Sequence, residues 1–296
     1  MGASISISKL KGMLLDEVSR FFRHNGSPWK EPILGVLNEL RKSNVQAVVF
    51  GGTLRSLLVS RIFEGKLGRP RDVDVVVAGI SVSALEEQFN DIIARRNRFG
   101  GLQLKRGSWT FDVWPLRDTW AFRQDGNDAG SFADLPSTTV FNIEAIAVEA
   151  WPKRGRPRAI FSGDDQFFEG ILSKTIELNR PNTAFPELTV VRAVVMAVEL
   201  AFRIGPQLSS YIAGVGPGLS EETVRHIQRS HYGYARMDST RLKQLIEFIS
   251  RRSSESTGVE LPPMGQLRLW ESGHDVVFPQ MKFHCLNSDL LDGSVR

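Results

Sequence analysis

Residues 46–55, Gln-Ala-Val-Val-Phe-Gly-Gly-Thr-Leu-Arg, and residues 72–78, Asp-Val-Asp-Val-Val-Val-Ala, decide the fold. The β-branched start of the first stretch predicts a buried strand, and Gly51-Gly52 predicts a tight turn at its end. The spacing of the leucines that follow predicts a helix over 53–63. A strand that ends in glycines at a helix start leaves backbone N–H groups exposed, and the helix dipole favours an anion there. The stretch therefore predicts a phosphate-binding turn.

Three carboxylates follow within about sixty residues of this turn. Asp72 and Asp74 are two apart on a predicted strand, so their side chains share one face of it. Asp112 lies in the apolar run Trp-Thr-Phe-Asp-Val-Trp, also a strand by its pattern. A carboxylate in such a run needs a partner, because an isolated buried charge is costly. Carboxylates on adjacent strands offer the hard oxygen ligands that suit Mg²⁺ with phosphates, although Asp112 taken alone can instead pair with Arg106 or Arg117.

Composition narrows the classes of protein. The chain has 296 residues, 42% of them hydrophobic and 24% charged, which excludes intrinsic disorder and repetitive fibrous classes. The net charge is 37 − 33 = +4, which allows a phosphate-bearing partner without requiring one. The single cysteine, Cys285, excludes an internal disulfide and favours a reducing compartment, so a cytoplasmic location is expected. No apolar run approaches the ~20 residues of a membrane span, and no membrane association is expected.

The pattern of elements predicts an α+β chain with a helical second part. We expect an N-terminal helical arm over 1–30, a mixed α/β head over 31–180 and a helical C-terminal domain over 181–296. Within the head the patterns predict further segments: helices over 31–42 and 83–98, strands over 46–50, 102–104, 109–114 and 138–151, a polar loop over 123–137, and a hairpin turn over 153–158. In the second part they predict helices over 186–204, 220–230 and 239–252.

The order of these motifs resembles the head domain of the poly(A) polymerase and CCA-adding tRNA nucleotidyltransferase family. That family, one of the DNA polymerase β-like nucleotidyltransferases, has a Gly-Gly-x-Val-Arg-Asp element followed by Asp-x-Asp. Here the corresponding stretches are Gly-Gly-Thr-Leu-Arg-Ser at 51–56 and Asp-Val-Asp at 72–74. Its third carboxylate strand resembles 111–117, its Phe-Thr-Ile-Asn-Ala-Leu-Ala strand resembles 141–147, and its later Leu-Arg-Ala helix resembles 191–193. The resemblance spans about residues 45–205 and implies a nucleotidyltransferase fold, a mixed sheet flanked by helices.

Several family residues are replaced in this chain. The Asp that ends the glycine element is Ser56. The Arg-Arg-Asp linked to ribose handling is replaced by Thr-Thr-Val at 138–140. The Glu-Asp-x-x-Arg that pairs with the incoming base has no match in Glu-Leu-Thr-Val at 187–190. The phosphate and metal apparatus is thus retained while base and sugar selection is lost or rebuilt, which argues against CCA addition to tRNA.

The resemblance implies an Mg²⁺-dependent transfer of a nucleotide from a nucleoside triphosphate (NTP) to a hydroxyl on RNA, a small molecule or a protein. Two Mg²⁺ ions would be held by Asp72, Asp74 and Asp112, with Asp112 also able to take the hydroxyl proton. The nucleotide-binding residues would be those of the turn and the first helical turn: Gly51, Gly52, Thr53 and Arg55. The alternative is an inactive relative that binds nucleotide or RNA as a partner protein.

Possible RNA contacts lie in two basic segments. The turn 153–158 is dense in Lys and Arg, although such a cluster is commonly only solvated. In the helical part the basic residues that can form a stripe for RNA are Arg225, Arg229, Arg236, Arg241, Lys243, Arg251 and Arg252. Tyr232 and Tyr234 lie among them and can stack on bases or pack in the core.

Two further features carry no assignment. Glu144 lies in an otherwise apolar stretch, and it either faces the carboxylates or pairs with an arginine. His226 and His231 are five apart, which is not the spacing of a helical metal pair, so we expect them to be structural.

Overall fold

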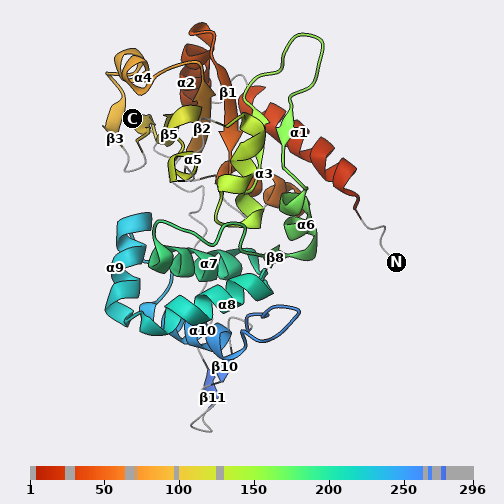
Figure 1. Cartoon of the computed structure of the whole chain (residues 1–296), viewed down its shortest axis with the longest axis vertical. Helices are drawn as coiled ribbons and strands as arrows, with labels where there is room; N and C mark the ends of the chain where they lie inside the picture. Colours follow the sequence, from red (N-terminus) through yellow and green to blue (C-terminus); the bar gives the residue numbers. More distant parts are fainter. Residues whose placement is uncertain are drawn as a thin grey trace, which may run out of the picture.

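The computed structural model describes residues 5–23, 31–63, 70, 72–96, 100–124 and 130–262, and the backbone of 266–268 and 275–277. A sheet with helices around it forms the upper half in Figure 1, and helices α7 to α10 form the lower half. This arrangement confirms the predicted α+β fold, a mixed sheet flanked by helices and followed by a helical part. Residues 24–30, 64–69 and most of 263–296, which include Cys285, lie outside the described residues.

The elements have the following bounds. The helices are α1 Ile7–Arg23, α2 Glu31–Lys42, α3 Gly52–Ile62, α4 Val82–Gln88, α5 Trp120–Gln124, α6 Gln166–Ser173, α7 Pro186–Leu200, α8 Pro206–Val215, α9 Glu221–Tyr232 and α10 Ser239–Arg251. The 3-10 helices are η1 Leu116–Asp118, η2 Phe132–Thr138, η3 Asn142–Glu144 and η4 Gly216–Gly218. The strands are β1 Gln46–Phe50, β2 Val73–Ala78, β3 Ile93–Arg96, β4 Leu102–Arg106, β5 Trp109–Pro115, β6 Ala147–Glu149, β7 Ile160–Phe161, β8 Thr175–Ile176, β9 Arg203–Ile204, β10 Gln266–Arg268 and β11 Asp275–Val277.

The main sheet has seven strands in the order β3-β4-β5-β2-β1-β6-β7. Strands β2 and β5 pair in parallel, and the other neighbours pair antiparallel. The central strands are apolar because both of their faces are covered: Val73, Val75 and Val77 are fully buried on one face and Val76 on the other. The sheet therefore gives a rigid base on which the ends of β1, β2 and β5 are fixed relative to one another.

Helix α1 packs against α3 and α6 on one side of the head (Figure 1). Its apolar residues recur at helical spacing, and Leu10, Leu14 and Val18 on that face are fully buried. Lys11 adds an ion pair to Asp165 at the start of α6. The predicted helix of the N-terminal arm is thus present, and its apolar face belongs to the same core as the sheet.

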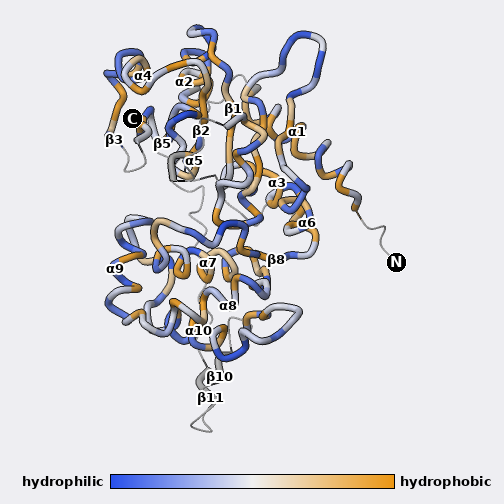
Figure 2. Tube along the Cα trace, viewed as in Figure 1, coloured by the Kyte–Doolittle hydropathy of each residue, from blue (hydrophilic) through white to orange (hydrophobic). Residues whose placement is uncertain are grey.

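In the helical part, α10 packs on α7, α8 and α9. Helix α7 is rich in apolar residues, coloured orange in Figure 2, and its core residues Val190, Val191 and Val194 are fully buried. Helix α8 was not predicted from the sequence. Its signals are Pro206 at the first turn after Gly205, and Gly216 at its end.

Three predicted segments were wrong in extent. The helix predicted over 83–98 is only α4, because Asn90 and Asp91 favour turns over helix interiors, and β3 follows. The helix predicted over 186–204 ends at Leu200, where Ala201 adopts the left-handed conformation before β9 pairs with β8.

The strand predicted over 138–151 was wrong as well: it consists of the end of η2, then η3, then the short β6. The turn forms because the Asn142 side chain bonds to the backbone. Its Oδ1 accepts from the N–H groups of Ile143 (2.8 Å) and Glu177 (2.8 Å), and its amide donates to the Thr175 carbonyl (3.1 Å). The loop predicted over 123–137 also contains η2, which begins with a capping box between Ser131 and Asp134.

The hairpin turn predicted over 153–158 does connect the antiparallel strands β6 and β7. In Figure 2 the loop after β6 is a hydrophilic segment that projects from the head. In the part of the chain that the structure describes, no helix is long and apolar enough to cross a membrane.

Candidate functional site

The site begins at the turn between β1 and α3. Gly51 has φ 67° and ψ −127°, a conformation that glycine adopts without a steric penalty, and its N–H donates to the Ile146 carbonyl at 3.0 Å. Helix α3 starts at Gly52, and no side chain caps its N-terminus. The predicted glycine turn at a helix start is therefore confirmed.

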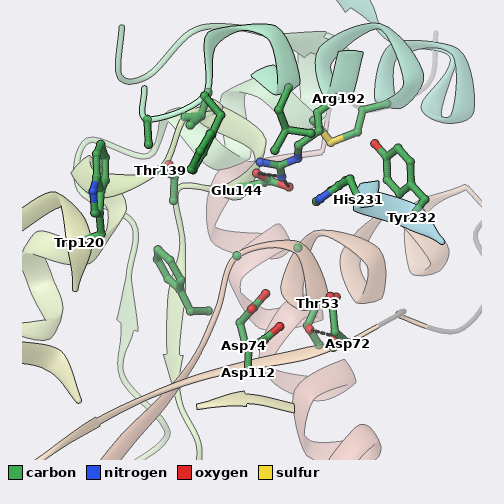
Figure 3. Close-up of a pocket in the computed structure, with 18 of the residues that line it drawn as sticks. Thr53, Asp72, Asp74, Asp112, Trp120, Thr139, Glu144, Arg192, His231 and Tyr232 are labelled. Carbon is green, nitrogen blue, oxygen red and sulfur yellow. Dashed lines mark hydrogen bonds and ion pairs between the residues drawn. The ribbon is translucent and has the colours of Figure 1, made fainter. Parts of the chain in front are cut away.

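Sheet register brings two of the predicted carboxylates together. Asp74 on β2 is the register partner of Asp112 on the parallel neighbour β5, and its partner on β1 is Phe50, the residue before the glycine turn. Both side chains are half-buried, and Figure 3 shows them next to each other, pointing into the same cavity. The Gln103 amide on β4 donates to Asp112 Oδ1 at 3.3 Å, which helps to orient that carboxylate.

Asp72 lies apart from this pair. It precedes β2, and its carbonyl accepts a 2.8 Å hydrogen bond from Thr53 Oγ1 (Figure 3). All three aspartates line the cavity, but among the described residues no group of three or more His, Cys, Asp or Glu side chains could hold a metal ion. The structure thus contains the pair Asp74–Asp112 rather than the predicted set of three, and the metal-binding and catalytic roles stay predictions.

The cavity is large, about 1730 Å³. One wall consists of the turn and the ends of the strands, and the opposite wall of residues from α7 and α9. Ligand pockets commonly have about 300–1000 Å³, so this volume has room for a nucleotide and part of a second substrate.

A buried ion triad joins the two walls. Glu144 Oε1 accepts from Arg55 Nη1 at 2.5 Å and from Arg192 Nη2 at 3.0 Å, and Arg192 Nη2 is also 2.9 Å from Oε2 (Figure 3). Arg55 belongs to α3, Glu144 to η3 and Arg192 to α7. Arg55 Nη1 also donates to Met196 Sδ on α7 at 3.0 Å. Of the two alternatives left open for Glu144, pairing with an arginine is therefore correct, and it involves two arginines.

The triad shifts the pKa values of Glu144 and Arg192. Burial alone would raise the pKa of Glu144, but the charges of Arg192 and Arg55 and their hydrogen bonds outweigh it, so the pKa lies below its ordinary value. Burial would lower the pKa of Arg192, but the charge of Glu144, with smaller contributions from Tyr232 and Asp74, raises it. Both shifts favour the charged forms of Glu144 and Arg192.

The predicted nucleotide-binding residues Gly51, Gly52, Thr53 and Arg55 all line the cavity. Two of them already have protein partners, since Thr53 bonds to the Asp72 carbonyl and Arg55 to Glu144. Their role with a nucleotide stays a prediction.

Sequence reasoning missed the contribution of the helical wall. Arg192, His226, His231 and Tyr232 line the cavity, although the two histidines were expected to be structural. The one signal for Arg192 was the resemblance of 191–193 to the Leu-Arg-Ala helix. For the two histidines there was no signal, because a spacing of five residues on one helix does not indicate that both line a cavity.

Only four of the seven residues of the predicted basic stripe are exposed. Arg241 is buried, Arg236 pairs with Glu199 at 3.0 Å, and Lys243 binds the Gly216 and Pro217 carbonyls. The stripe residues that remain exposed are Arg225, Arg229, Arg251 and Arg252. In the turn 153–158 the first five residues are exposed, while Arg158 is buried and donates to Ser19 Oγ at 2.9 Å.

The site stands on a seven-stranded mixed sheet flanked by helices and followed by a helical part, which is the fold that the resemblance predicts. Known structures agree with this class of fold. A Thermotoga maritima CCA-adding enzyme complexed with tRNA(CCA) is similar to this chain with a TM-score of 0.53 and 17% identity, covering 80% of this chain and 55% of that one. A CCA-adding enzyme with CTP has a TM-score of 0.51 and 16% identity, covering 78% and 53%.

This chain thus spans little more than half the length of those structures. No protein-family model and no curated protein matches it. At such low identity the likeness shows the fold, and it supports the resemblance to nucleotidyltransferases at that level.

Proposed function

We propose that the chain is an Mg²⁺-dependent nucleotidyltransferase that transfers a nucleotide from an NTP to a hydroxyl acceptor. The observation that carries the proposal is the register pair Asp74–Asp112, half-buried beside the Gly51-Gly52 turn in a cavity with room for two substrates. Like charges side by side repel unless a cation lies between them, so this pair favours the binding of a divalent cation.

The residues fit a magnesium ion that arrives with the nucleotide. Mg²⁺ is commonly held by one or two carboxylates together with substrate phosphates, and Asp74 and Asp112 supply two carboxylates. When bound, the ion would polarise the phosphoryl oxygens and neutralise their charge. The second ion expected from the sequence depends on Asp72, which lies beside Thr53.

The chain's own groups then have definite tasks. The free N–H groups at the start of α3 bind the β- and γ-phosphates. The Asp112 carboxylate accepts the proton of the acceptor hydroxyl. The acceptor oxygen forms a bond to the α-phosphorus while the bond to the bridging oxygen breaks, and pyrophosphate carries away that electron pair. The helical wall limits the access of water to the phosphates.

The acceptor remains one of three classes: RNA, a small molecule or a protein. The solved structures named above include complexes with tRNA and with CTP. The residues that replace the base-reading and ribose-reading motifs line the cavity, among them Thr139, Val140 and Glu187. These replacements favour an acceptor and a base preference that differ from those of CCA addition.

The transfer experiment uses each labelled NTP with Mg²⁺ and an RNA pool. Asp74→Asn and Asp112→Asn are compared with the wild type and with Asp91→Asn, a control that removes an exposed carboxylate outside the cavity. We expect product from the wild type and the control, at least about 100-fold less from the two cavity variants, and none after chelation of Mg²⁺. Equal activity of all four proteins would refute the proposal.

A second candidate function is nucleotide or RNA binding without transfer. The observation that favours it is that Arg55 is already paired with Glu144, while no group of three metal ligands is formed among the described residues. In the same experiment this function predicts nucleotide binding, no labelled product, and no effect of Asp74→Asn.

A further inference from the structure

Glu144 lies directly against the glycine turn. A Cβ built on Gly52 would be 3.8 Å from Glu144 Oε1 and 3.5 Å from Arg55 Nη2, and one on Gly51 would be 3.9 Å from the Glu144 carbonyl. The triad is therefore adjacent to the backbone that the proposed function assigns to phosphate binding.

In this triad the two cations are more exposed than the anion. The side chains of Arg55 and Arg192 are 16% and 26% exposed, against 11% for Glu144, and all three line the cavity. Arg55 Nε is buried without a hydrogen-bond partner. The triad has two positive charges and one negative charge, so its net charge is +1, and the positive ends are the parts that a ligand in the cavity can reach.

The two sides of the cavity have opposite charge. Asp74 and Asp112 lie on the sheet side, and Arg192 lies on the α7 side, near enough to Asp74 for that charge to contribute to its raised pKa. A polyphosphate with a bound divalent cation has the matching distribution, because its metal faces carboxylates and its outer oxygens face guanidinium groups.

We propose that Arg55 and Arg192 form a subsite for a phosphoanion, and that Glu144 limits its affinity by neutralising one of the two positive charges. The carboxylate fixes the two guanidinium groups in place and occupies part of their hydrogen-bonding capacity. Two arginines without this counter-ion would hold a polyphosphate product more tightly and release it more slowly. This subsite would belong to the same site as the proposed function, and the identity of its natural ligand rests on that function.

The test measures binding of inorganic tripolyphosphate by calorimetry, without Mg²⁺ and without nucleotide. The net charge of the triad is +1 in the wild type, +2 in Glu144→Gln and 0 in Arg192→Gln. We expect affinity to follow this charge: about tenfold or more tighter in Glu144→Gln and about tenfold or more weaker in Arg192→Gln. The control applies the same changes to the ion pair Arg203–Glu260, which lies outside the cavity lining, and we expect no change in affinity.

Opposite shifts separate the proposal from a purely structural role, because damage to the site would weaken binding in both variants. Weaker or unchanged binding in Glu144→Gln overturns the proposal. If Glu144→Gln does not fold, Arg192→Gln decides alone, since it leaves Glu144 paired with Arg55. Unchanged or tighter binding of tripolyphosphate by Arg192→Gln then overturns the proposal. A wild type that binds no tripolyphosphate overturns it as well. A protein that shows the expected order and yet transfers no nucleotide retains the subsite and refutes the proposed transferase activity.

Discussion

Substitution of the two adjacent glycines by alanine should separate backbone strain from ligand access. Gly51 has φ 67° and ψ −127°, where an alanine is strained although its Cβ would meet nothing closer than 3.9 Å. Such strain costs about 1–3 kcal/mol. Gly52 is the first residue of α3, and its φ is not positive. A Cβ on Gly52 would have Arg55 Nη2 as its nearest neighbour, at 3.5 Å. Alanine there costs nothing or stabilises by up to about 1 kcal/mol.

The two variants should therefore show opposite behaviour. Gly51→Ala should lower the unfolding free energy by about 2 kcal/mol, a fall in Tm of roughly 4–8 °C for a cooperative unit of the head's size. Gly52→Ala should keep or slightly raise the wild-type Tm but weaken NTP binding at least about tenfold, because its methyl group would lie beside the backbone N–H groups that are proposed to bind the phosphates. Calorimetric scans and nucleotide titrations measure both quantities. Wild-type nucleotide affinity in Gly52→Ala would refute the assignment of this turn to phosphate binding.

Three further predictions concern individual contacts. The pKa of Glu144 is lowered in the folded state, so the contribution of its charge to stability is complete above the ordinary carboxyl pKa of about 4.3 and is lost as the pH falls through the lowered pKa. The difference in unfolding free energy between the wild type and Glu144→Gln should therefore shrink below about pH 4 in a series of denaturation curves. A difference that stays constant with pH would contradict this prediction. Thr53→Val should cost about 1–2 kcal/mol, because the buried hydroxyl bonds to the Asp72 carbonyl at 2.8 Å, and Thr53→Ser should recover most of the loss in the same urea titrations. Lys11→Met should cost no more than about 1 kcal/mol, since the pair with Asp165 is partly exposed, and 1 M salt should remove the difference; a larger or salt-independent cost would contradict this assignment.

The central strands and the glycine turn could be predicted because their signals are local. The run 46–50 is β-branched, and the two glycines end it, so neither depends on distant residues. The pairing of Asp74 with Asp112 followed once both were placed on strands, although the sequence alone did not show that these strands are parallel neighbours. The exclusion of Asp72 from the pair was not predicted, because β2 begins one residue later than its pattern suggested.

The features that were missed depend on contacts between distant segments. The apolar run 138–151 has the composition of a strand, but the side chain of Asn142 bonds to the backbone of Thr175 in β8 and of Glu177, and the chain forms η3 there instead. Arg192 reaches Glu144 across 48 residues of sequence, and no periodicity within either segment indicates such a contact. The wall formed by α7 and α9 was beyond prediction for the same reason.

The parallel pairing of β2 with β5 has a consequence for how the site is acquired during folding. These two strands are separated by β3, β4 and α4, and the acidic pair exists only when β5 has taken its place between β2 and β4. An intermediate with only the β1–β2 pair would present the glycine turn with Asp74 but without Asp112. If the proposed function is correct, a metal-bound nucleotide would be recognised only after β5 has paired with β2, and such a ligand would stabilise only chains in which this parallel pairing is formed.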